Sequence, residues 1–330
     1  MQKKHYKEFA QVLTDWFATH GKNYPWRNTT DPWAILVSEI MLQQTTIPTV
    51  LGRYEAWMQQ FPTPADLAKV DEQTALRSWE GLGYYRRVRA LRAAAIAIVE
   101  QYGGIFPTEE AAIRALPGIG DYTAGAVLSF AFNKPAPLVD ANVSRVFARV
   151  FNDNTPVDSP AGRKRHWALA AELVHKDNPR YYNSALMELG QTICTASAPT
   201  CQLCPVREFC AAENPTSLPV KLPQKEILQT AHHDLWCMTS QGLLMEKQAN
   251  GKRHEGMYRL PQRKQEEVAQ LPLLTTQKYS VTRYKVTRYL YATESELPRV
   301  NEVFIPLSAL PKIPMASPDR KIVNKLSNRS

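Results

Sequence analysis

The chain has 330 residues, 44% of them apolar, which is enough for two or three domains with buried cores. This composition excludes wholesale disorder, and no uncharged apolar stretch reaches the ~18 residues of a membrane span. The net charge of +9 favours polyanionic partners, nucleic acid first. Because the N-terminal segment lacks the pattern of a secretion signal, we expect a cytoplasmic protein, associated with the nucleoid if the source is bacterial.

The positive charge is unevenly distributed. Residues 1–225 carry 24 Lys and Arg against 21 Asp and Glu, a net of +3, whereas residues 226–330 carry 16 against 10, a net of +6. The shorter C-terminal part therefore holds most of the excess.

Two compositional zones predict two kinds of structure. Residues 1–212 show apolar stripes at helical spacing, such as Phe9 with Leu13, separated by Gly and Pro. A Pro- and Lys-bearing linker is predicted at 213–228. Residues 229–330 contain short β-branched and aromatic runs, which predict strands and a small α+β domain.

The first chemical signal is an acidic residue within an apolar helical run. The segment 34–42 reads AILVSEIML, so Glu39 interrupts an otherwise apolar helix, and Gln43-Gln44-Thr45 follow it. A buried Glu is rare unless it is paired or functional. The alternative is that Glu39 lies on a solvated edge of the helix.

The second signal is a glycine hairpin between two helical stretches, at about 112–130. The segment 116–126 reads LPGIGDYTAGA, and Gly118 and Gly120 allow a tight, positive-φ backbone. They also expose backbone N–H groups at the start of the next helix, where a phosphate binds. A plain helix–helix turn is the alternative interpretation. Twenty residues after Gly120 comes Asp140, which either caps a following helix or acts in catalysis, two compatible roles.

The third signal is a group of cysteines. Cys194, Cys201, Cys204 and Cys210 are spaced C-x6-C-x2-C-x5-C, whereas Cys237 stands apart. Without a secretion signal such clusters indicate metal ligands rather than disulfides. Four thiolates can hold one zinc or one 4Fe–4S cluster, and the compact single loop favours the cluster.

These motifs together resemble a known superfamily. The cysteine spacing and the LPGIG-x-x-TAG string are similar to the cluster loop and the helix-hairpin-helix of the endonuclease III and MutY DNA glycosylases, whose pattern continues to an Asp matched by Asp140. Glu-x-Met-Leu-Gln-Gln-Thr, at 39–45, resembles the MutY-type adenine DNA glycosylases, and the likeness extends over about residues 20–225. The resemblance implies a mostly α, helix-hairpin-helix glycosylase region at 1–212, with an iron–sulfur loop at 194–210, and a Nudix-like α+β domain at 229–330.

The resemblance also implies a two-carboxylate reaction. Glu39 would protonate adenine at a ring nitrogen and help to activate water, which requires an apolar pocket that raises its pKa. Asp140, ionised and beside Asn142 and Tyr122, would stabilise or transiently bond to the sugar carbon. Endonuclease III-like enzymes carry a Schiff-base lysine where this chain has Tyr122, so we expect base excision without efficient strand cleavage.

Further residues are assigned to DNA by the same resemblance. The base must leave the stack to react, and Arg27 and Glu188 would contact the flipped adenine. The residues expected on the opposite strand are Gln44, Thr45, Leu82 and Tyr84. On spacing alone Leu82 and Tyr84 fit a protein core equally well.

The C-terminal zone matches the family more loosely. It has no Nudix box, so nucleotide hydrolysis is not expected. Where the family carries a Phe-Ser-His-like triplet that reads 8-oxoguanine, the best counterpart is Val281-Thr282-Arg283, and Arg283 is always charged and only donates. Either this is a strand with one solvated face, or Arg283, Lys285 and Arg288 grip phosphate or a guanine edge.

The expected function is therefore excision of adenine mispaired with 8-oxoguanine or guanine, with altered lesion preference. The cofactor would be a 4Fe–4S cluster, the partner double-stranded DNA containing mispaired adenine, and the protein a monomer with no membrane association. The alternatives are a related glycosylase for another mismatch or damaged base, and a non-catalytic DNA-binding homologue.

Overall fold

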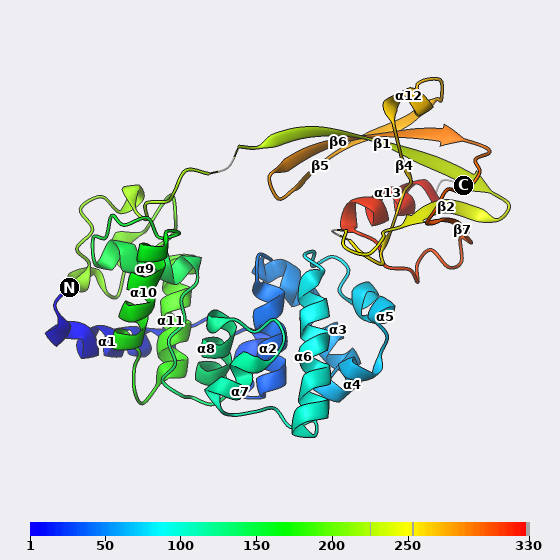
Figure 1. Cartoon of the computed structure of the whole chain (residues 1–330). Coiled ribbons are helices and arrows are strands. Elements are labelled where there is room, and N and C mark those ends of the chain that lie inside the picture. Colours follow the sequence, from blue (N-terminus) through cyan, green and yellow to red (C-terminus); the bar gives the residue numbers. More distant parts are fainter. Residues whose placement is uncertain (225, 253, 328–330) are drawn as a thin grey trace. The chain divides into compact units, whose positions relative to one another are not determined.

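The computed structural model describes residues 1–224, 226–252 and 254–327. The chain forms two compact units, one made of residues 1–68 and 90–223 and the other of residues 69–89 and 224–330 (Figure 1). The second boundary falls inside the segment expected to be a linker. The short segment 69–89, which sequence patterns place among the helices, associates with the sheet unit instead.

The first unit is helical, and its described residues form no strand. Its helices are α1 (Tyr6–His20), α2 (Pro32–Leu42), α3 (Ile47–Gln60), α4 (Pro64–Lys69), α6 (Arg86–Tyr102, which begins in the second unit), α7 (Glu110–Ala115), α8 (Asp121–Phe130), α9 (Ala141–Val150), α10 (Pro160–Leu173) and α11 (Pro179–Thr192), with 3-10 turns η1 (Lys3–His5), η2 (Pro25–Arg27), η3 (Cys201–Leu203), η4 (Arg207–Phe209) and η5 (Pro215–Ser217).

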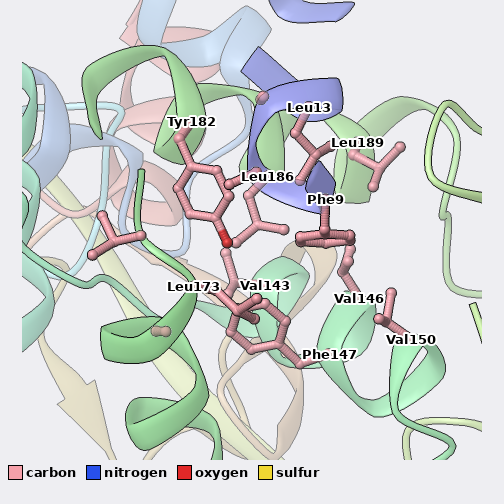
Figure 2. Packing of buried hydrophobic residues seen from close by; sticks show 14 of the residues in the cluster. Phe9, Leu13, Val143, Val146, Phe147, Val150, Leu173, Tyr182, Leu186 and Leu189 are labelled. Carbon is pink, nitrogen blue, oxygen red and sulfur yellow. The ribbon is translucent and has the colours of Figure 1, made fainter. Parts of the chain in front are cut away.

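A core of large apolar side chains joins α1, α9 and α11 (Figure 2). Phe9 and Leu13, predicted on one helical face, are both fully buried, and Phe147 and Leu186 pack into the same cluster. Each such side chain contributes about 1.5–3 kcal/mol by leaving water. This core fixes α9, the helix that begins directly after Asp140.

Helix α2 is unusual because it is buried on every side. Nine consecutive residues, from Trp33 to Met41, are shielded from solvent. The helix starts after Asp31, whose carboxylate accepts hydrogen bonds from the backbone N–H groups of Trp33 at 3.0 Å and Ala34 at 3.3 Å. Any polar residue on α2 is therefore a buried one.

The second unit contains a mixed seven-stranded sheet and short helices. The elements are α5 (Glu72–Ser78), β1 (Leu228–Thr239), β2 (Gly242–Lys247), β3 (Tyr258–Arg259), β4 (Gln262–Arg263), α12 (Gln265–Val268), β5 (Leu273–Val281), β6 (Tyr284–Thr293), β7 (Glu302–Ile305) and α13 (Ser317–Ser327). The main strand order is β3-β2-β1-β6-β5, with β4 beside β1 and β7 beside β2, and the β1–β6 pair is parallel. The expected α+β character of this zone is confirmed.

Strands β5 and β6 form a tight hairpin. Val281 pairs with Tyr284, so Thr282 and Arg283 make a two-residue turn in which Thr282 has a φ of 53°. The alternative of a single strand with one solvated face is therefore wrong here. The turn contains neither Gly nor Asn, the usual residues of a two-residue hairpin turn, which is why the pattern did not locate it.

Among the described residues, no helix is long and apolar enough to cross a lipid bilayer.

Candidate active site

Glu39 lies near the C-terminal end of the buried helix α2. It is 4% exposed, and its Oε2 accepts a hydrogen bond of 2.7 Å from the hydroxyl of Tyr122, on α8. The solvated-edge alternative for Glu39 is thereby excluded. A carboxyl on a helix that is buried all round has only the groups of its pocket to replace water.

Burial raises the pKa of Glu39 to about 7. The hydrogen bond from Tyr122 and the charge of Arg27 oppose this rise, whereas the nearby negative charge of Asp140 adds to it. Glu39 therefore holds a proton in a substantial fraction of molecules at neutral pH, which is the requirement for a general acid.

Asp140 occupies the N-cap of α9, as the sequence predicted. Its Oδ1 accepts the backbone N–H of Val143 at 2.7 Å, and its Oδ2 accepts the side-chain amide of Asn142 at 2.8 Å. Burial raises its pKa, but these hydrogen bonds and the charge of Arg145 act in the other direction by stabilising the carboxylate. Asp140 thus accepts two hydrogen bonds that stabilise its charged form. Glu39, by contrast, accepts a hydrogen bond from one hydroxyl, that of Tyr122, and lies on an apolar helix.

Tyr122 links the two carboxyl groups electrostatically. Burial raises its pKa well above the ordinary value, and the charges of Glu39 and Asp140 raise it further. The hydroxyl consequently keeps its proton and serves as a donor. The structure brings together all four residues predicted for catalysis, which are Glu39, Tyr122, Asp140 and Asn142.

Arg27 and Glu188 form a buried ion pair. Arg27 Nη1 lies 2.7 Å from Glu188 Oε2, and the guanidinium stacks over the rings of Phe17 and Tyr24. Glu188 is 1% exposed. The two residues that the resemblance assigns to the flipped base are thus partners of one another, and the arginine charge also reaches Glu39.

The glycine hairpin joins α7 to α8. Gly118 has a φ of +75°, and a Cβ there would lie 2.5 Å from the Cβ of Ala90, so both the turn and the packing require glycine. Gly120 has a φ of −93°, which corrects the expectation of positive φ at both positions. It is the N-cap of α8, supplies no side-chain cap, and has open space where a Cβ would be. The first N–H groups of α8 therefore receive no cap from a Gly120 side chain, and Tyr122 is the second residue of this helix.

Two arginines of α9 hold the start of the cysteine loop. Arg149 is 1% exposed and donates to the carbonyl of Thr195 at 2.7 Å and to Cys194 Sγ at 3.3 Å. Arg145 donates to the carbonyl of Cys194 at 2.8 Å and to Asn142 Oδ1 at 2.9 Å. A chain of hydrogen bonds thus runs from Asp140 through Asn142 and Arg145 to Cys194.

Sequence reasoning missed Arg145 and Arg149. The available signal was an arginine repeated at i and i+4 of a helix whose last turns are otherwise apolar, since buried arginines need partners.

The four clustered cysteines share one loop and carry free thiols. Burial raises the pKa of Cys204 to about 11, and the charges of the other three thiols act on it. Among the described residues, no three potential ligands converge tightly enough to hold a single metal ion. The donor set offered by this loop is four cysteine thiols, one of which, Cys194, accepts a hydrogen bond from Arg149.

Known proteins match this arrangement. Residues 37–168 match the family described as "HhH-GPD superfamily base excision DNA repair protein". The solved structure of a thermostable thymine-DNA glycosylase has a TM-score of 0.58 and 32% identity, and the match covers 63% of this chain and 96% of that one. The structure of an endonuclease III–DNA complex has a TM-score of 0.54 and 22% identity, and the match covers 64% of this chain and 96% of that one. At this identity the match supports only the similarity of fold.

The chain belongs to the HhH-GPD superfamily of base excision DNA repair proteins.

Curated relatives of this HhH-GPD protein are named adenine DNA glycosylase. The Homo sapiens protein is 40% identical over 213 residues, which are 62% of this chain and 39% of that protein. The Arabidopsis thaliana protein is 37% identical over 257 residues, 68% and 41% of the two chains. The Mycobacterium tuberculosis protein is 39% identical over 200 residues, 60% and 66%. The match thus spans about two fifths of the length of the human and plant relatives.

The four residues of this HhH-GPD protein that were expected to contact the opposite DNA strand are not all exposed. Gln44 is exposed and Thr45 partly so, in the turn after α2, and Gln44 has a φ of 56°. Tyr84 is 40% exposed with a φ of 46°. Leu82 is 4% exposed, so its expected contact with DNA is not supported and it belongs to the packing under its loop.

The residues of the β5–β6 hairpin that were assigned to DNA also divide into exposed and buried ones. Thr282 and Arg283 are exposed at the tip, and the Arg283 guanidinium stacks over the ring of Tyr284. Arg288 is 3% exposed and bonded to Asp234 and Asp319, so the expectation that it grips DNA is wrong.

The raised pKa of Glu39 predicts a pH-dependent stability. The folded protein holds this proton up to about pH 7, whereas the unfolded chain releases it near 4.5, so the stability due to this group falls as the pH rises across that window. We expect Glu39→Gln to stabilise the chain more at pH 8 than at pH 5. The free energy of unfolding that the variant gains over the unsubstituted chain should be about 2 kcal/mol larger at pH 8. Urea denaturation at the two pH values measures this difference.

Ser38→Ala is the matched control, because Ser38 is equally buried and does not titrate. Its effect on stability should be the same at both pH values. An equal effect of Glu39→Gln at pH 5 and pH 8 would contradict the raised pKa.

Proposed function

We propose that this HhH-GPD protein is a monofunctional DNA glycosylase that removes adenine mispaired with 8-oxoguanine or guanine. The observation that carries the proposal is Glu39, a buried carboxyl with a pKa of about 7, hydrogen-bonded to Tyr122 and close enough to Asp140 for their charges to interact. The curated relatives named adenine DNA glycosylase support the choice of base.

Glu39 supplies the acid. Adenine is a poor leaving group, so the bond to deoxyribose breaks readily only when a ring nitrogen of the base is protonated. A neutral carboxyl in an apolar pocket is such a donor, and the Tyr122 hydroxyl fixes the direction in which it points. The base must first leave the stack, because a buried side chain cannot reach into a duplex.

Asp140 supplies the negative charge. As the glycosidic bond breaks, positive charge develops on the sugar ring, and a carboxylate beside it lowers the energy of that state. Val143 N–H and Asn142 stabilise the ionised form of Asp140 and hold it at the start of α9. After giving up its proton, Glu39 can accept one from the attacking water, which completes hydrolysis.

The proposal excludes efficient strand cleavage. The lyase reaction needs an amine that forms a Schiff base with the sugar, and the hairpin position that would carry it holds Tyr122. The Tyr122 hydroxyl is bonded to Glu39 and keeps its proton, so it is no substitute.

We also propose that Cys194, Cys201, Cys204 and Cys210 hold a 4Fe–4S cluster. Four thiols within one loop of 17 residues suit that donor set, and the hydrogen bond from Arg149 to Cys194 Sγ would stabilise a ligating thiolate. When bound, the cluster would supply structural order rather than a step of hydrolysis. It would staple the loop and place Arg207 near the DNA backbone.

The sheet unit would read the base opposite adenine. We propose that residues 229–330 are a Nudix-like domain without hydrolase activity, joined through the segment 213–228. The exposed Thr282 and Arg283 at the hairpin tip are placed for such contacts. Arginine matches the acceptor edge of guanine, so we propose that preference for 8-oxoguanine over guanine is altered in this chain. The partner would be duplex DNA, bound by a monomer at the bacterial nucleoid.

Thymine excision is the second candidate function. It is favoured by the 32% identity to a thermostable thymine-DNA glycosylase over 63% of this chain. A duplex panel with thymine or adenine opposite guanine separates the two candidates.

The first prediction concerns excision. Single-turnover assays on adenine opposite 8-oxoguanine, guanine and cytosine should show base release, with strand breaks only after alkali treatment. Glu39→Gln removes the acid and should lower the rate by about 10²–10⁴. Glu55→Gln, an exposed carboxyl on α3, should leave the rate unchanged. Excision that survives Glu39→Gln would remove the acid from the mechanism.

The second prediction concerns the hairpin tip. If Arg283 reads a guanine edge, Arg283→Ala should change the ratio of excision rates opposite 8-oxoguanine and guanine by about fivefold or more, since one base contact is worth about 1–3 kcal/mol. Lys278→Ala, an exposed cation on the same hairpin, is the control and should scale both rates together. A steep 8-oxoguanine preference that is the same with and without Arg283 would disprove the role.

The third prediction concerns the cluster. The purified chain should contain about four iron atoms and four acid-labile sulfides. Cys204→Ser should lose most of both, whereas Cys237→Ser, buried in the sheet unit, should keep them. One bound zinc per chain in place of iron would contradict the assignment.

A further inference from the structure

The first turn of α13 carries a buried ion pair to a loop 240 residues away in the sequence. Arg320 Nε lies 2.6 Å from Glu80 Oε1, and its Nη2 lies 3.2 Å from Glu80 Oε2. Both side chains are largely buried, 12% and 8% exposed. A two-pronged contact of this kind fixes direction as well as distance.

Glu80 belongs to the loop that presents Tyr84. The Trp79 indole N–H donates to the carbonyl of Gly83 at 3.0 Å, and Arg87 donates to the carbonyl of Leu82 at 2.8 Å, so the loop is internally braced. At its end the hydroxyl of Tyr85 donates to the carbonyl of Met315 at 2.9 Å, two residues before α13 begins. The Tyr84 loop is therefore anchored to α13 at two points.

Asp319, next to Arg320, contacts the β5–β6 hairpin instead. Asp319 Oδ1 lies 2.9 Å from Arg288 Nη2, and Arg288 Nε lies 2.7 Å from Asp234 Oδ2. Arg288 Nη1 also donates to Gln277 Oε1 on β5 at 3.2 Å. Strand β6 is thus held to α13 by the Arg288–Asp319 pair, which is 3% and 7% exposed, and β5 is joined to it through Gln277.

We propose that the first turn of α13 is a coupling element that sets the position of the Tyr84 loop relative to the Thr282–Arg283 tip. Glu80, Arg320, Asp319 and Arg288 are its positioning residues. The inference rests on the proposed function, in which the hairpin tip reads the base opposite adenine, and on the expectation that Tyr84 contacts the same strand. It adds that reading this base requires the two segments to be held in one geometry. All these residues lie in the sheet unit, whereas Glu39 and Asp140 lie in the helical unit.

Buried ion pairs suit this task because they tolerate little change. Without Arg320, Glu80 would keep only the longer and more exposed contact with Arg77 at 3.3 Å, and the carbonyls of Leu310 and Ile313 would lose their donor. A set of apolar contacts would instead repack with small shifts. Tyr84 and Thr282 both have positive φ, at 46° and 53°, and such conformations persist only where the surroundings impose them.

The test uses the full-length chain and the variant Arg320→Met. Single-turnover excision is measured opposite 8-oxoguanine and opposite guanine, with the burst amplitude giving the active fraction. We expect the ratio of the two rates to change at least fivefold, because positioning affects the two opposite bases unequally. Arg320→Lys, which keeps the charge, should restore part of the ratio, and Glu80→Gln with Arg320→Met should be non-additive.

Arg299→Met is the matched control. It removes an exposed arginine–carboxylate pair of the same unit, to Glu267 at 2.7 Å, and should leave the ratio unchanged. If Arg320→Met lowers both rates by one factor, or only the burst amplitude, its role is structural and the coupling is disproved.

Hydrogen exchange separates failure of the coupling from failure of the proposed function. Arg320→Met should speed amide exchange in both 79–85 and 277–288, a result that needs no enzymatic activity. If the unsubstituted chain excises no base but this exchange pattern is found, the proposed function fails and the coupling stands. Faster exchange confined to residues near Arg320 overturns the coupling whatever the activity.

Discussion

The structure of the candidate site depends on a single carboxyl group that is kept out of water. Glu39 projects from a helix that is buried on all sides, and its solvation is replaced by one hydroxyl, that of Tyr122. The cost of burying a charge there raises the pKa of Glu39 to about 7. The other parts of the helical unit serve this arrangement: α8 brings Tyr122, and the core around Phe147 holds α9 and with it Asp140.

The same local elements perform two tasks. Gly118 allows the tight turn before α8, Gly120 offers no side-chain cap to its first N–H groups, and Tyr122 follows two residues later in the first turn. A phosphate-sized anion at this helix start would therefore lie close to the proton donor without any further loop. On α9 the cap residue Asp140 is likewise both the end of a helix and a charged group of the site. Short sequence motifs suffice for such a site because each residue has a structural and a chemical role.

The sequence predicted those parts in which local chemistry and position coincide. Glu39 was recognisable as an acid in an apolar helix, and Asp140 as a cap after a hairpin. The hydrogen bonds of Arg149 to the cysteine loop and the ion pairs of Arg288 were not, because their partners lie 31 or more residues away and no local pattern encodes them. The turn at Thr282 was missed because it contains neither Gly nor Asn, and only the pairing of Val281 with Tyr284 reveals it. Prediction from the sequence was therefore limited by long-range pairing rather than by secondary structure.

The excess charge of the C-terminal part has a more specific meaning once these pairs are known. Arg263, Arg288 and Arg320 are neutralised by buried carboxylates within the sheet unit and contribute little to its outer field. No acidic residue occurs between Glu267 and Glu294, a stretch that contains the whole β5–β6 hairpin. Its exposed cations, Lys278, Arg283 and Lys285, are therefore uncompensated by any carboxylate of the hairpin itself. Long-range attraction of a polyanion is thus directed at the segment whose tip carries Thr282 and Arg283, and the buried arginines keep that segment in place.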